Sequence, residues 1–558
     1  MALNLVLNYQ PYDNKKHGKC SAYIDNGICN LIEYRKMPRG KYMKKTFKFQ
    51  KDECLYGGTA YDGARNPFTA DSVYHADFRV LCQNQTMPLY LSTKGRYFYS
   101  ETPFAVTIEN GEITFDGGEV KEYQAGNCLR EAYLAAMHAH FPFDGRALPE
   151  DFFRTAQYNT WMEYTYDPTE EKVLAYAEAV IKNGFAPGIL IIDEGWHGRY
   201  GQWEFDPHKF PHPKEMIEKL HKMGFKVLLW VVPLVCPDGQ FFIRHCFENL
   251  PDAVPDASRL FVRTKEGEVA LFKWWNGFSA ALDMRKACDR EFMDAQLRHL
   301  MEDYGVDGFK FDGGTVDMYA SVLGGTPRED EDAHAMNIAW NDFGRRYDYH
   351  EYKDTYHGGG KCGIQRLCDK DHRWIGNGID TFVPACAITG LLGHPFICPD
   401  MIGGGEWIYN TMPDFHVDEE LFVRMAEASA LLPMMQFSWA PWRLLSNENL
   451  SNVRKMSELH LKMSDEILAL VENARETGEP IVRFMEYNYP NEGYHAITDQ
   501  FMLGEKILVA PVITKGTRER GVVFPRGKWI DADQVVYEGG RTCVIASPLG
   551  KLLYFKKV

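Results

Sequence analysis

One stretch of the chain ends in an acid that is placed to do chemistry. Residues 304–314, Tyr-Gly-Val-Asp-Gly-Phe-Lys-Phe-Asp-Gly-Gly, predict a short buried strand, because β-branched and aromatic side chains fill it and a glycine pair ends it. Side chains alternate along a strand, so Lys310 and Asp312 project the same way. An ammonium group favours the ionised form of a nearby carboxyl, and an ionised Asp at a strand end is a usable nucleophile. A cap of the next helix is the plainer interpretation of the same Asp.

Acids and tryptophans recur at other predicted strand ends. Asp193 and Glu194 follow one apolar run, Asp400 follows another, and Trp161 ends a third. In a βα barrel the C-terminal ends of the strands form the active face. Cleavage of a glycosidic bond needs one ionised carboxylate and one protonated carboxyl, and aromatic side chains suit the apolar faces of sugars. The combination therefore favours a glycosidase, although each acid alone also fits a cap or a loop anchor.

A cation-dependent barrel hydrolase is the chemical alternative at an acidic barrel mouth. Such an enzyme favours histidines at strand ends, whereas these five histidines fall on predicted helices and loops: His208, His212, His221, His245 and His299. The 13 cysteines include no C-x-x-C pair, which argues against a zinc site. We therefore expect neither a metal nor another cofactor.

The elements that must position these side chains change along the chain. Residues 1–150 consist of short strand-forming runs separated by turn signals, which predicts an N-terminal β-sandwich. Residues 151–476 alternate apolar strands with amphipathic helices, which predicts an α/β domain. Residues 477–558 return to strands and turns, which predicts a small C-terminal β-sandwich.

The repeated βα units of the central domain favour a closed (β/α)8 TIM barrel, with a loop-rich insertion near residues 237–273. An open doubly wound sheet is the alternative, but no glycine-rich dinucleotide loop follows the first strand. We expect a helix at residues 127–140 before the barrel and one long helix at residues 450–472 at its end.

Composition limits the partners. The 558 residues are 45% hydrophobic and 14% aromatic, and the net charge of −15 argues against nucleic acid or an anionic membrane as a partner. The number of cysteines is odd, and several lie inside apolar runs, which predicts reduced thiols. The N-terminal residues lack the basic and apolar regions of a signal peptide, so we expect a cytoplasmic protein that acts on oligosaccharides or glycosides. A homo-oligomer is compatible with the sequence but is not required by it.

Several motifs, taken in order, resemble those of glycoside hydrolase family 31. The similar segments are 193–196 (DEGW), 201–211 (GQWEFDPHKFP), 224–233 (GFKVLLWVVP), 274–277 (WWNG), 309–314 (FKFDGG), 391–404 (LLGHPFICPDMIGG) and 436–442 (QFSWAPW). The pattern is most similar to the branch of the family that includes myogenesis-regulating glycosidase. It extends over about residues 155–545, whereas the first 150 residues match the family only loosely.

The resemblance implies a retaining mechanism on α-glycosides, with Asp312 as nucleophile. Asp369 is the implied acid/base, as the first Asp of a D-x-D-x-x-W pattern in residues 369–374, and Asp371 is its rival. The α-glucosidases carry an acid at the last position of a W-x-G-D pattern, whereas this chain has Asn377 at that position. An Asn cannot be a general acid, so a catalytically impaired glycan-binding or transglycosylating homologue is an alternative. The residues expected to bind the sugar are Trp161, Asp193, Glu194, Trp230, Trp275, Lys310, Arg366 and Asp400.

Departures from the α-glucosidase pattern bear on the substrate. Lys310-Phe-Asp312 replaces W-I-D and resembles α-galactosidases of the related families 27 and 36, as does the DEGW motif. The R-N-H motif with which α-glucosidases end a later strand is here Gln436-Phe437-Ser438. We therefore expect a terminal α-galactoside or α-N-acetylgalactosaminide as substrate, with an α-glucoside or α-xyloside as the alternative.

Overall fold

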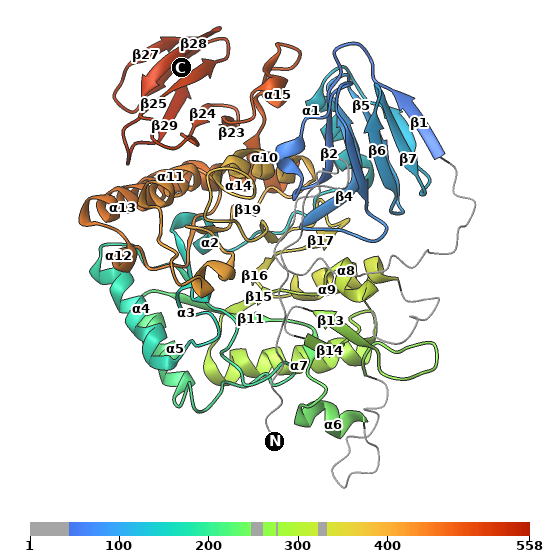
Figure 1. Ribbon diagram of the computed structural model, residues 1–558, viewed down its shortest axis with the longest axis vertical. Coiled ribbons are helices and arrows are strands. Elements are labelled where there is room, and N and C mark those ends of the chain that lie inside the picture. Colours follow the sequence, from blue (N-terminus) through green and yellow to red (C-terminus); the bar gives the residue numbers. More distant parts are fainter. Residues whose placement is uncertain (1–43, 247–259, 275–276, 322–331) are drawn as a thin grey trace, which may run out of the picture. The chain divides into compact units, whose positions relative to one another are not determined.

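The computed structural model describes residues 44–246, 260–274, 277–321 and 332–558, and its central feature is a parallel sheet (Figure 1). Nine strands join in the order β19-β18-β16-β15-β11-β10-β9-β21-β20, and every neighbouring pair is parallel. Their bounds are β9 Gln157–Asn159, β10 Ile189–Ile192, β11 Lys226–Val231, β15 Gly308–Phe311, β16 Tyr349–Tyr352, β18 Ile364–Arg366, β19 Ile397–Cys398, β20 Met401–Ile402 and β21 Gln436–Phe437.

The two ends of this sheet, β19 and β20, are neighbours in the chain and are separated only by Pro399 and Asp400. β19 pairs with β18, whereas β20 pairs with β21, so β19 and β20 are two halves of one strand position. The nine strands thus occupy eight positions, and the sheet closes on itself. At the break Asp400 has a φ of 98°, a conformation that residues other than glycine rarely adopt. The predicted (β/α)8 TIM barrel is confirmed.

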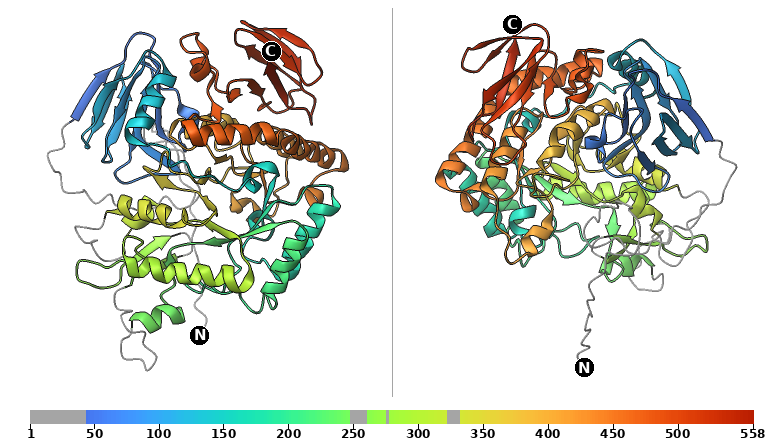
Figure 2. Two further views of the ribbon diagram at one scale, coloured as in Figure 1. Left: turned by 180° about the vertical axis from the view of Figure 1, so that it is seen from behind. Right: turned by 45° about the horizontal axis from the view of Figure 1, so that its top comes forward.

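Helices connect most of the strands and lie outside them (Figures 1 and 2). α4 is typical, because it buries Val173, Tyr176, Ala177 and Val180 on one face, and the Thr169 side chain caps its N-terminus. Among the described residues of 151–477, the α-helices outside the insertion are α2 Asp151–Arg154, α3 Trp161–Tyr164, α4 Glu170–Lys182, α5 Pro213–Lys222, α7 Ala287–Tyr304, α8 Val316–Ala320, α9 Ala333–Gly344, α10 Phe382–Leu391, α11 Glu419–Ser429, α12 Pro441–Leu444, α13 Asn447–Lys462 and α14 Ser464–Thr477.

The single helix expected at residues 450–472 is wrong, because the chain forms two helices, α13 and α14, that meet at Met463. Met463 has a ψ of 5° and is buried, so the chain bends there while its apolar pattern continues. The pattern of buried positions is what the sequence displays, and a bend at a buried residue leaves that pattern intact.

The connection from β16 to β18 contains no helix, although all of its residues are described. Instead β17 (Thr355–Tyr356) pairs in parallel with β4 (Gln85–Ser92), a strand of the N-terminal β-rich domain. The register joins Thr355 to Gln85 and Tyr356 to Thr86. The sandwich therefore occupies the place that a helix takes elsewhere round the barrel, which the repeating sequence pattern did not predict.

The N-terminal domain packs two antiparallel sheets face to face. One has the order β1-β7-β6-β3, and the other joins β4, β5, β8 and β2. Apolar side chains from both sheets, such as Tyr90, Phe98, Val106 and Phe115, form the core between them. The bounds are β1 Lys44–Lys48, β2 Leu55–Thr59, β3 Tyr74–Asp77, β5 Arg96–Tyr99, β6 Ala105–Glu109, β7 Glu112–Asp116 and β8 Lys121–Gln124, and the helix expected next is α1 Leu129–His140. Residues 1–43, which belong to the predicted sandwich, lie outside the described residues.

The predicted insertion near residues 237–273 contains α6 (Gln240–Cys246), and residues 247–259 lie outside the described residues. A small antiparallel sheet with the order β12-β14-β13 adjoins it, formed by β12 Leu234–Val235, β13 Leu271–Trp274 and β14 Gly277–Ala281. In the sequence, the insertion and this sheet both lie between barrel strands β11 and β15, and Asp312 directly follows β15.

The C-terminal domain contains a larger and a smaller antiparallel sheet, with the orders β22-β23-β24-β29-β26-β27 and β25-β28. Trp529, Phe524 and Phe555 are among the buried side chains between them. The elements are β22 Val482–Arg483, α15 Met485–Asn488, β23 Phe501–Leu503, β24 Ile507–Ala510, β25 Glu519–Phe524, β26 Lys528–Asp531, β27 Val536–Glu538, β28 Arg541–Ala546 and β29 Leu553–Lys557. The expected β-rich domains on both sides of the barrel are therefore present.

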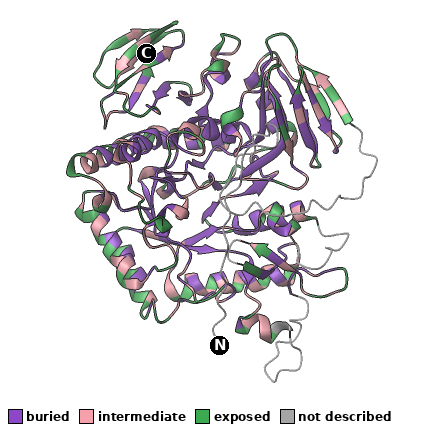
Figure 3. Cartoon of the chain, in the orientation of Figure 1, coloured by how far each residue is buried: buried purple, intermediate pink, exposed green. Residues whose placement is uncertain are grey.

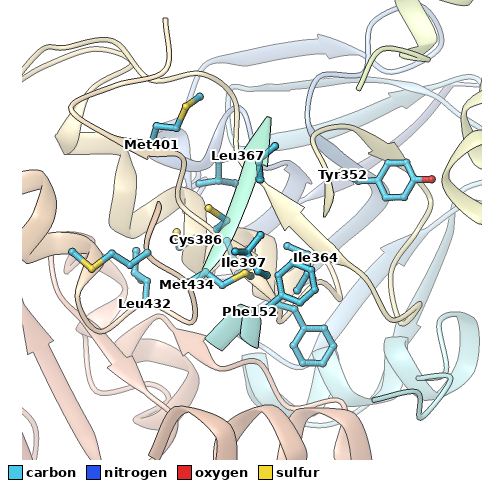
Figure 4. Close-up of a cluster of buried hydrophobic side chains, with 14 of the residues drawn as sticks. Phe152, Tyr352, Ile364, Leu367, Cys386, Ile397, Met401, Leu432 and Met434 are labelled. Carbon is cyan, nitrogen blue, oxygen red and sulfur yellow. The ribbon is translucent and has the colours of Figure 1, made fainter. Parts of the chain in front are cut away.

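The strands of the barrel are buried on both faces, as Figure 3 shows, although polar side chains such as Lys310, Glu351 and Arg366 are among the buried residues. Figure 4 shows part of the apolar core, where Ile364, Ile397 and Cys386 lie beside Phe152 and Met434. Burial on both faces holds the strands in place, so that their C-terminal ends are fixed points from which side chains project.

Candidate active site

Asp312 directly follows β15 and is held by two neighbours. Trp230 Nε1, from the adjacent strand β11, donates a hydrogen bond to Asp312 Oδ2 at 3.0 Å. The backbone N–H of Gly313 donates to Oδ1 at 2.8 Å. The next helix, α8, is capped by the Thr315 side chain, so Asp312 is not the cap that its position alone also fitted.

Positive charges decide the ionisation of Asp312. Burial alone would raise the pKa of its carboxyl, but Lys353, Lys310 and Arg366, with the hydrogen bond from Trp230, outweigh burial and lower it. The side chain is therefore an ionised carboxylate in a fixed orientation. This is the form that a nucleophile needs.

Asp193 and Lys310 form a buried ion pair across the barrel. Lys310 Nζ lies 2.6 Å from Asp193 Oδ2, and both side chains are only 3% exposed. Asn159 Nδ2, from β9, donates to the same oxygen at 2.8 Å. Lys310 thus contributes its charge to Asp312 while its ammonium group bonds to Asp193. The structure brings all three predicted residues together.

Glu194 is in the opposite ionisation state. Burial, with the negative charges of Asp193 and Asp312 nearby, raises the pKa of Glu194 to about 8. The Tyr200 hydroxyl donates a hydrogen bond to Glu194 Oε1. Glu194 is therefore protonated at neutral pH, so it can both donate and accept hydrogen bonds at the barrel mouth.

Arg366 connects the remaining acids. Its Nη1 lies 2.6 Å from Asp400 Oδ1 and 2.9 Å from Asp369 Oδ1, and its Nε lies 3.3 Å from Glu351 Oε1. Arg366 and Asp400 are almost completely buried, at 1% and 0% side-chain exposure. Asp400 also accepts a hydrogen bond from Lys370 N at 2.7 Å. These contacts make Arg366 and Asp400 supports for the loop that carries Asp369.

Asp369 is held by two cations. Lys353 Nζ lies 2.5 Å from its Oδ2, and Arg366 Nη1 contacts its Oδ1. Burial alone would raise the pKa of Asp369, but these cations outweigh it and hold the pKa well below its usual range. In this structure Asp369 is thus a base, and its use as an acid requires that it lose the contact with Lys353 and take up a proton from solvent.

Asp371, the rival of Asp369 as acid/base, has other neighbours than Asp369. The Tyr409 hydroxyl lies 3.3 Å from Asp371 Oδ1. Asn377 Nδ2 donates to the carbonyl oxygen of Asp369 at 2.7 Å, and Asn377 O accepts from Asp371 N at 2.8 Å. Asn377 therefore fastens the backbone of the loop that carries both acids. The side chain that replaces the acid of the W-x-G-D pattern has a structural use here.

The three tryptophans that were expected to bind the sugar differ in their surroundings. Trp161 begins α3, is 7% exposed, and donates from Nε1 to Gly405 O at 3.2 Å. Trp230 bonds to Asp312 and stacks on Trp274, with ring centroids 6.2 Å apart. Trp275 lies outside the described residues. Trp230 thus supports the nucleophile itself, which its place inside an apolar run did not indicate.

Lys353 and Glu351 were not among the residues expected to bind the sugar, although both lie at the centre of the charge network. They end β16 as Glu351-Tyr-Lys353, the same alternation that Lys310-Phe-Asp312 shows at the end of β15. Glu351 is buried among Arg366 and Gln436. The period of two at a strand end was the signal that could have identified them.

Two further properties of the described segments concern metal ions and membranes. No group of three or more His, Cys, Asp or Glu side chains in those segments is arranged to hold a metal ion. No helix in the same segments is long and apolar enough to cross a membrane.

Comparison with known families agrees with this geometry. The model described as the Glycosyl hydrolases family 31 TIM-barrel domain matches residues 147–467, more than half of the 558 residues. The chain belongs to glycoside hydrolase family 31. A second model, the Glycosyl hydrolase family 31 C-terminal domain, matches residues 478–557. The resemblance carried by the sequence motifs is confirmed.

Curated relatives of this family 31 chain have several names. It is 32% identical to the mouse (Mus musculus) protein named myogenesis-regulating glycosidase, over 72% of this chain and 56% of that protein. It is 26% identical to alpha-glucosidase 2 of Bacillus thermoamyloliquefaciens, over 71% of this chain and 51% of that protein. The chain therefore spans about half the length of the relatives it matches.

Solved structures share the fold. A family 31 dextranase from Flavobacterium johnsoniae matches 92% of this chain and 66% of its own, with a TM-score of 0.76 and 19% identity. A cycloalternan-degrading enzyme from Trueperella pyogenes matches 92% of this chain and 81% of its own, with a TM-score of 0.74 and 20% identity. At these identities the likeness concerns the arrangement of the barrel and its flanking domains.

Proposed function

We propose that the protein is a retaining exo-α-glycosidase that hydrolyses a terminal, non-reducing α-linked sugar. The observation that carries the proposal is the arrangement at Asp312, an ionised carboxylate oriented by Trp230 and Gly313 at a barrel strand end. Lys353 links this carboxylate electrostatically to the second one, Asp369. Two carboxyls on opposite sides of one sugar are the requirement for a double displacement.

The reaction proceeds in two displacements. Before the first displacement Asp369 must give up its contact with Lys353 and take up a proton from solvent. Asp312 then attacks the anomeric carbon and forms an ester to the sugar, while the bond to the leaving oxygen breaks and Asp369 gives that oxygen the proton. Asp369, now ionised as it is in this structure, takes a proton from water, and the water oxygen attacks the anomeric carbon. The ester bond to Asp312 breaks, and the sugar leaves with its original anomeric configuration.

We assign sugar binding to the residues around Asp312. Asp193 accepts and the protonated Glu194 donates or accepts hydrogen bonds, which suits adjacent sugar hydroxyls. Lys310 holds Asp193 in place. Arg366 and Asp400 act by supporting Asp369. Trp161 and Trp275 are proposed to line the subsite.

The sugar that we favour is galactose or N-acetylgalactosamine. Ser438, at the position of the His in the R-N-H motif, is completely buried and its Oγ accepts a hydrogen bond from Met162 N at 2.7 Å. Gln436 contacts Gln157 and Glu351 inside the barrel. Neither Ser438 nor Gln436 replaces the histidine that holds a hydroxyl of glucose in the α-glucosidases. The absence of that histidine from the motif supports a sugar with an axial O4. An α-glucoside or α-xyloside is the alternative, since relatives are named alpha-glucosidase and alpha-xylosidase.

A panel of p-nitrophenyl α-glycosides tests the proposal: galactose, N-acetylgalactosamine, glucose, xylose and sulfoquinovose. We expect the highest kcat/KM on one of the first two, with the product released as the α-anomer in a nuclear magnetic resonance time course. Asp312→Ala should abolish this activity, because it removes the attacking carboxylate. Full activity of Asp312→Ala, or a β-anomeric product, contradicts the mechanism, whereas another preferred sugar corrects only the substrate.

Asp369 is tested separately. Asp369→Ala should slow the cleavage of poor leaving groups far more than that of 2,4-dinitrophenolate, which needs no proton. Azide should restore turnover as a glycosyl azide, because the anion attacks without a general base. Glu194→Gln is the matched variant, since Glu194 is a carboxyl at the mouth whose pKa is raised to about 8, so that it holds a proton at neutral pH. The reverse pattern, with leaving-group dependence in Glu194→Gln alone, would assign the acid to Glu194.

We further propose that the protein works in the cytoplasm on oligosaccharides or glycosides, without nucleic acid, membrane or cofactor, and that a homo-oligomer is compatible with this activity. The support is the ten free cysteines among the described residues, five of them buried thiols. Fractionation of cells that express the chain tests the location, and size-exclusion chromatography with light scattering tests the oligomeric state.

A further inference from the structure

The N-terminal sandwich reaches the barrel mouth through Asn84, the residue before β4. Its Nδ2 donates a hydrogen bond to Lys353 O at 3.0 Å, and its Oδ1 accepts one from Cys368 N at 2.8 Å. One buried side-chain amide thus bridges two loops that follow different strands, β16 and β18. The first loop begins with Lys353, and Cys368 immediately precedes Asp369.

Gln85 adds a second set of contacts to the same place. Its Nε2 lies 3.1 Å from Lys353 O, 3.2 Å from Arg366 O and 3.2 Å from Gln365 Oε1. The side chain is completely buried. In addition, Thr355 N donates to Asn84 O at 3.3 Å, so backbone and side chains of the sandwich all engage the connection that lacks a helix.

The geometry of the acid/base depends on the relation between these two loops. Lys353 Nζ and Asp369 Oδ2 are 2.5 Å apart, yet they extend from different loops. A shift of either loop changes the distance between ammonium and carboxylate and also the place of the acid relative to the leaving oxygen. Misplacement by about 1 Å can lower a rate about a hundredfold.

The geometry points to Asn84 as a positioning residue for catalysis. The amide of Asn84 sets the loop of Lys353 against the loop of Asp369, so the N-terminal sandwich is a working part of the active site. This inference rests on the proposed function, because it assigns to Asp369 the transfer of the proton to the leaving oxygen. Gln85 supports the same arrangement of loops through its contact with Arg366 O.

Asn84 offers a clean substitution. Its φ is 55°, a conformation that glycine adopts without strain and most other residues adopt only with strain. Asn84→Gly therefore deletes the bridge and keeps the backbone, whereas Asn84→Asp keeps the acceptor for Cys368 N and loses the donor to Lys353 O. Asn110, in the β6–β7 turn of the same domain, has a φ of 52° and is exposed, so Asn110→Gly is the matched control.

The experiment measures kcat/KM for aryl α-glycosides of one sugar with leaving groups of graded pKa, and for the α-glycosyl fluoride. In Asn84→Gly we expect a loss of about ten- to a hundredfold for the poorest leaving groups and less than about twofold for the fluoride. Asn84→Asp should lie between, and Asn110→Gly should equal the wild type. An equal loss on all substrates, or no loss on any, overturns the inference.

A measurement that needs no turnover accompanies the kinetics. Amide hydrogen exchange in peptides that cover residues 353–357 and 367–371 should accelerate in Asn84→Gly and stay unchanged in Asn110→Gly, because Cys368 N loses its acceptor. Unchanged exchange in Asn84→Gly overturns the inference even if every glycoside proves inert. Inertness of the wild type on the whole panel, with the expected exchange, would instead contradict the proposed function.

Discussion

The ammonium group of Lys353 lies 2.5 Å from Oδ2 of Asp369 and also lowers the pKa of Asp312. One lysine at the end of β16 thus influences both carboxylates of the proposed double displacement. Asp369 and Asp312 in turn raise the pKa of Lys353, so the lysine remains charged across the whole range in which an enzyme works.

Lys353→Met should move the pH profile of kcat/KM to higher pH. Without the cation, the pKa of Asp312 rises, so activity appears at a higher pH on the acid side; the pKa of Asp369 also rises, so its protonated form persists further on the basic side. Because the pKa values of both carboxyls lie below the ordinary value of 3.8 in the wild type, the pH profile must extend from about pH 2 to about pH 8 to compare the variants. Lys353→Arg keeps the charge and should keep the profile. Coincident profiles for Lys353→Met and wild type contradict the role of Lys353.

Trp230→Phe should move only the acid limb. The indole N–H stabilises the ionised form of Asp312, and a hydrogen bond to a charged group contributes about 1.5–3 kcal/mol, equivalent to about 1–2 pH units. Loss of this bond raises the pKa of Asp312, so activity should begin at a higher pH. Trp274→Phe, which alters the stacking on Trp230 without touching this bond, is the control. A shift of equal size in both variants would assign the effect to packing.

Lys310→Met should destabilise the fold by about 3–5 kcal/mol, because it leaves Asp193 as a buried charge without its ion pair. Urea unfolding followed by fluorescence measures the free energy of unfolding. Lys361→Met is the matched control: Lys361 Nζ also lies 2.6 Å from a carboxylate, that of Asp342, but these side chains are 38% and 47% exposed. The control should cost less than about 1 kcal/mol. Equal costs would contradict the role of burial.

Glu194→Gln should make stability less dependent on pH. The pKa of Glu194 is about 8 in the folded protein, against an ordinary value of 4.5, so the folded state retains a proton that the unfolded state loses. The stability that this proton provides is complete below pH 4.5 and is lost as pH rises through about 8. Thermal unfolding at pH 5 and pH 9 should show the variant gaining on the wild type at pH 9. The same difference at both values would refute the raised pKa.

Asn377→Asp should reduce activity rather than create it. The substitution replaces the donor to Asp369 O by an acceptor, which loosens the loop that carries Asp369. The kcat for the best p-nitrophenyl glycoside measures the effect, and Asn377→Ala should show a similar loss. A gain in Asn377→Asp over an inactive wild type would favour the alternative of an impaired homologue, in which Asn377 stands where an acid is missing.

Much of the barrel was predictable because its signals are local. Strands β10 and β15 are short runs that directly precede Asp193 and Asp312, β11 is an apolar run that precedes Val232 and Pro233, and the helices α4, α5 and α7 lie between these strands in the chain. The helix-free connection after β16 was not predictable. Its backbone partners are in β4, more than 250 residues away, and no local pattern records a pairing at that distance.

The sequence by itself determined that Asp312 ends a strand two residues after Lys310, and its motifs indicated family 31. Those conclusions depend on the period of a single strand and on residue order, which are properties of the chain alone. Only the tertiary structure decided the partners: Lys310 bonds to Asp193, Lys353 to Asp369, and Asn84 to both loops. Each of these contacts joins separate strands or domains, so it exists only once the barrel has closed and the sandwich has docked on it.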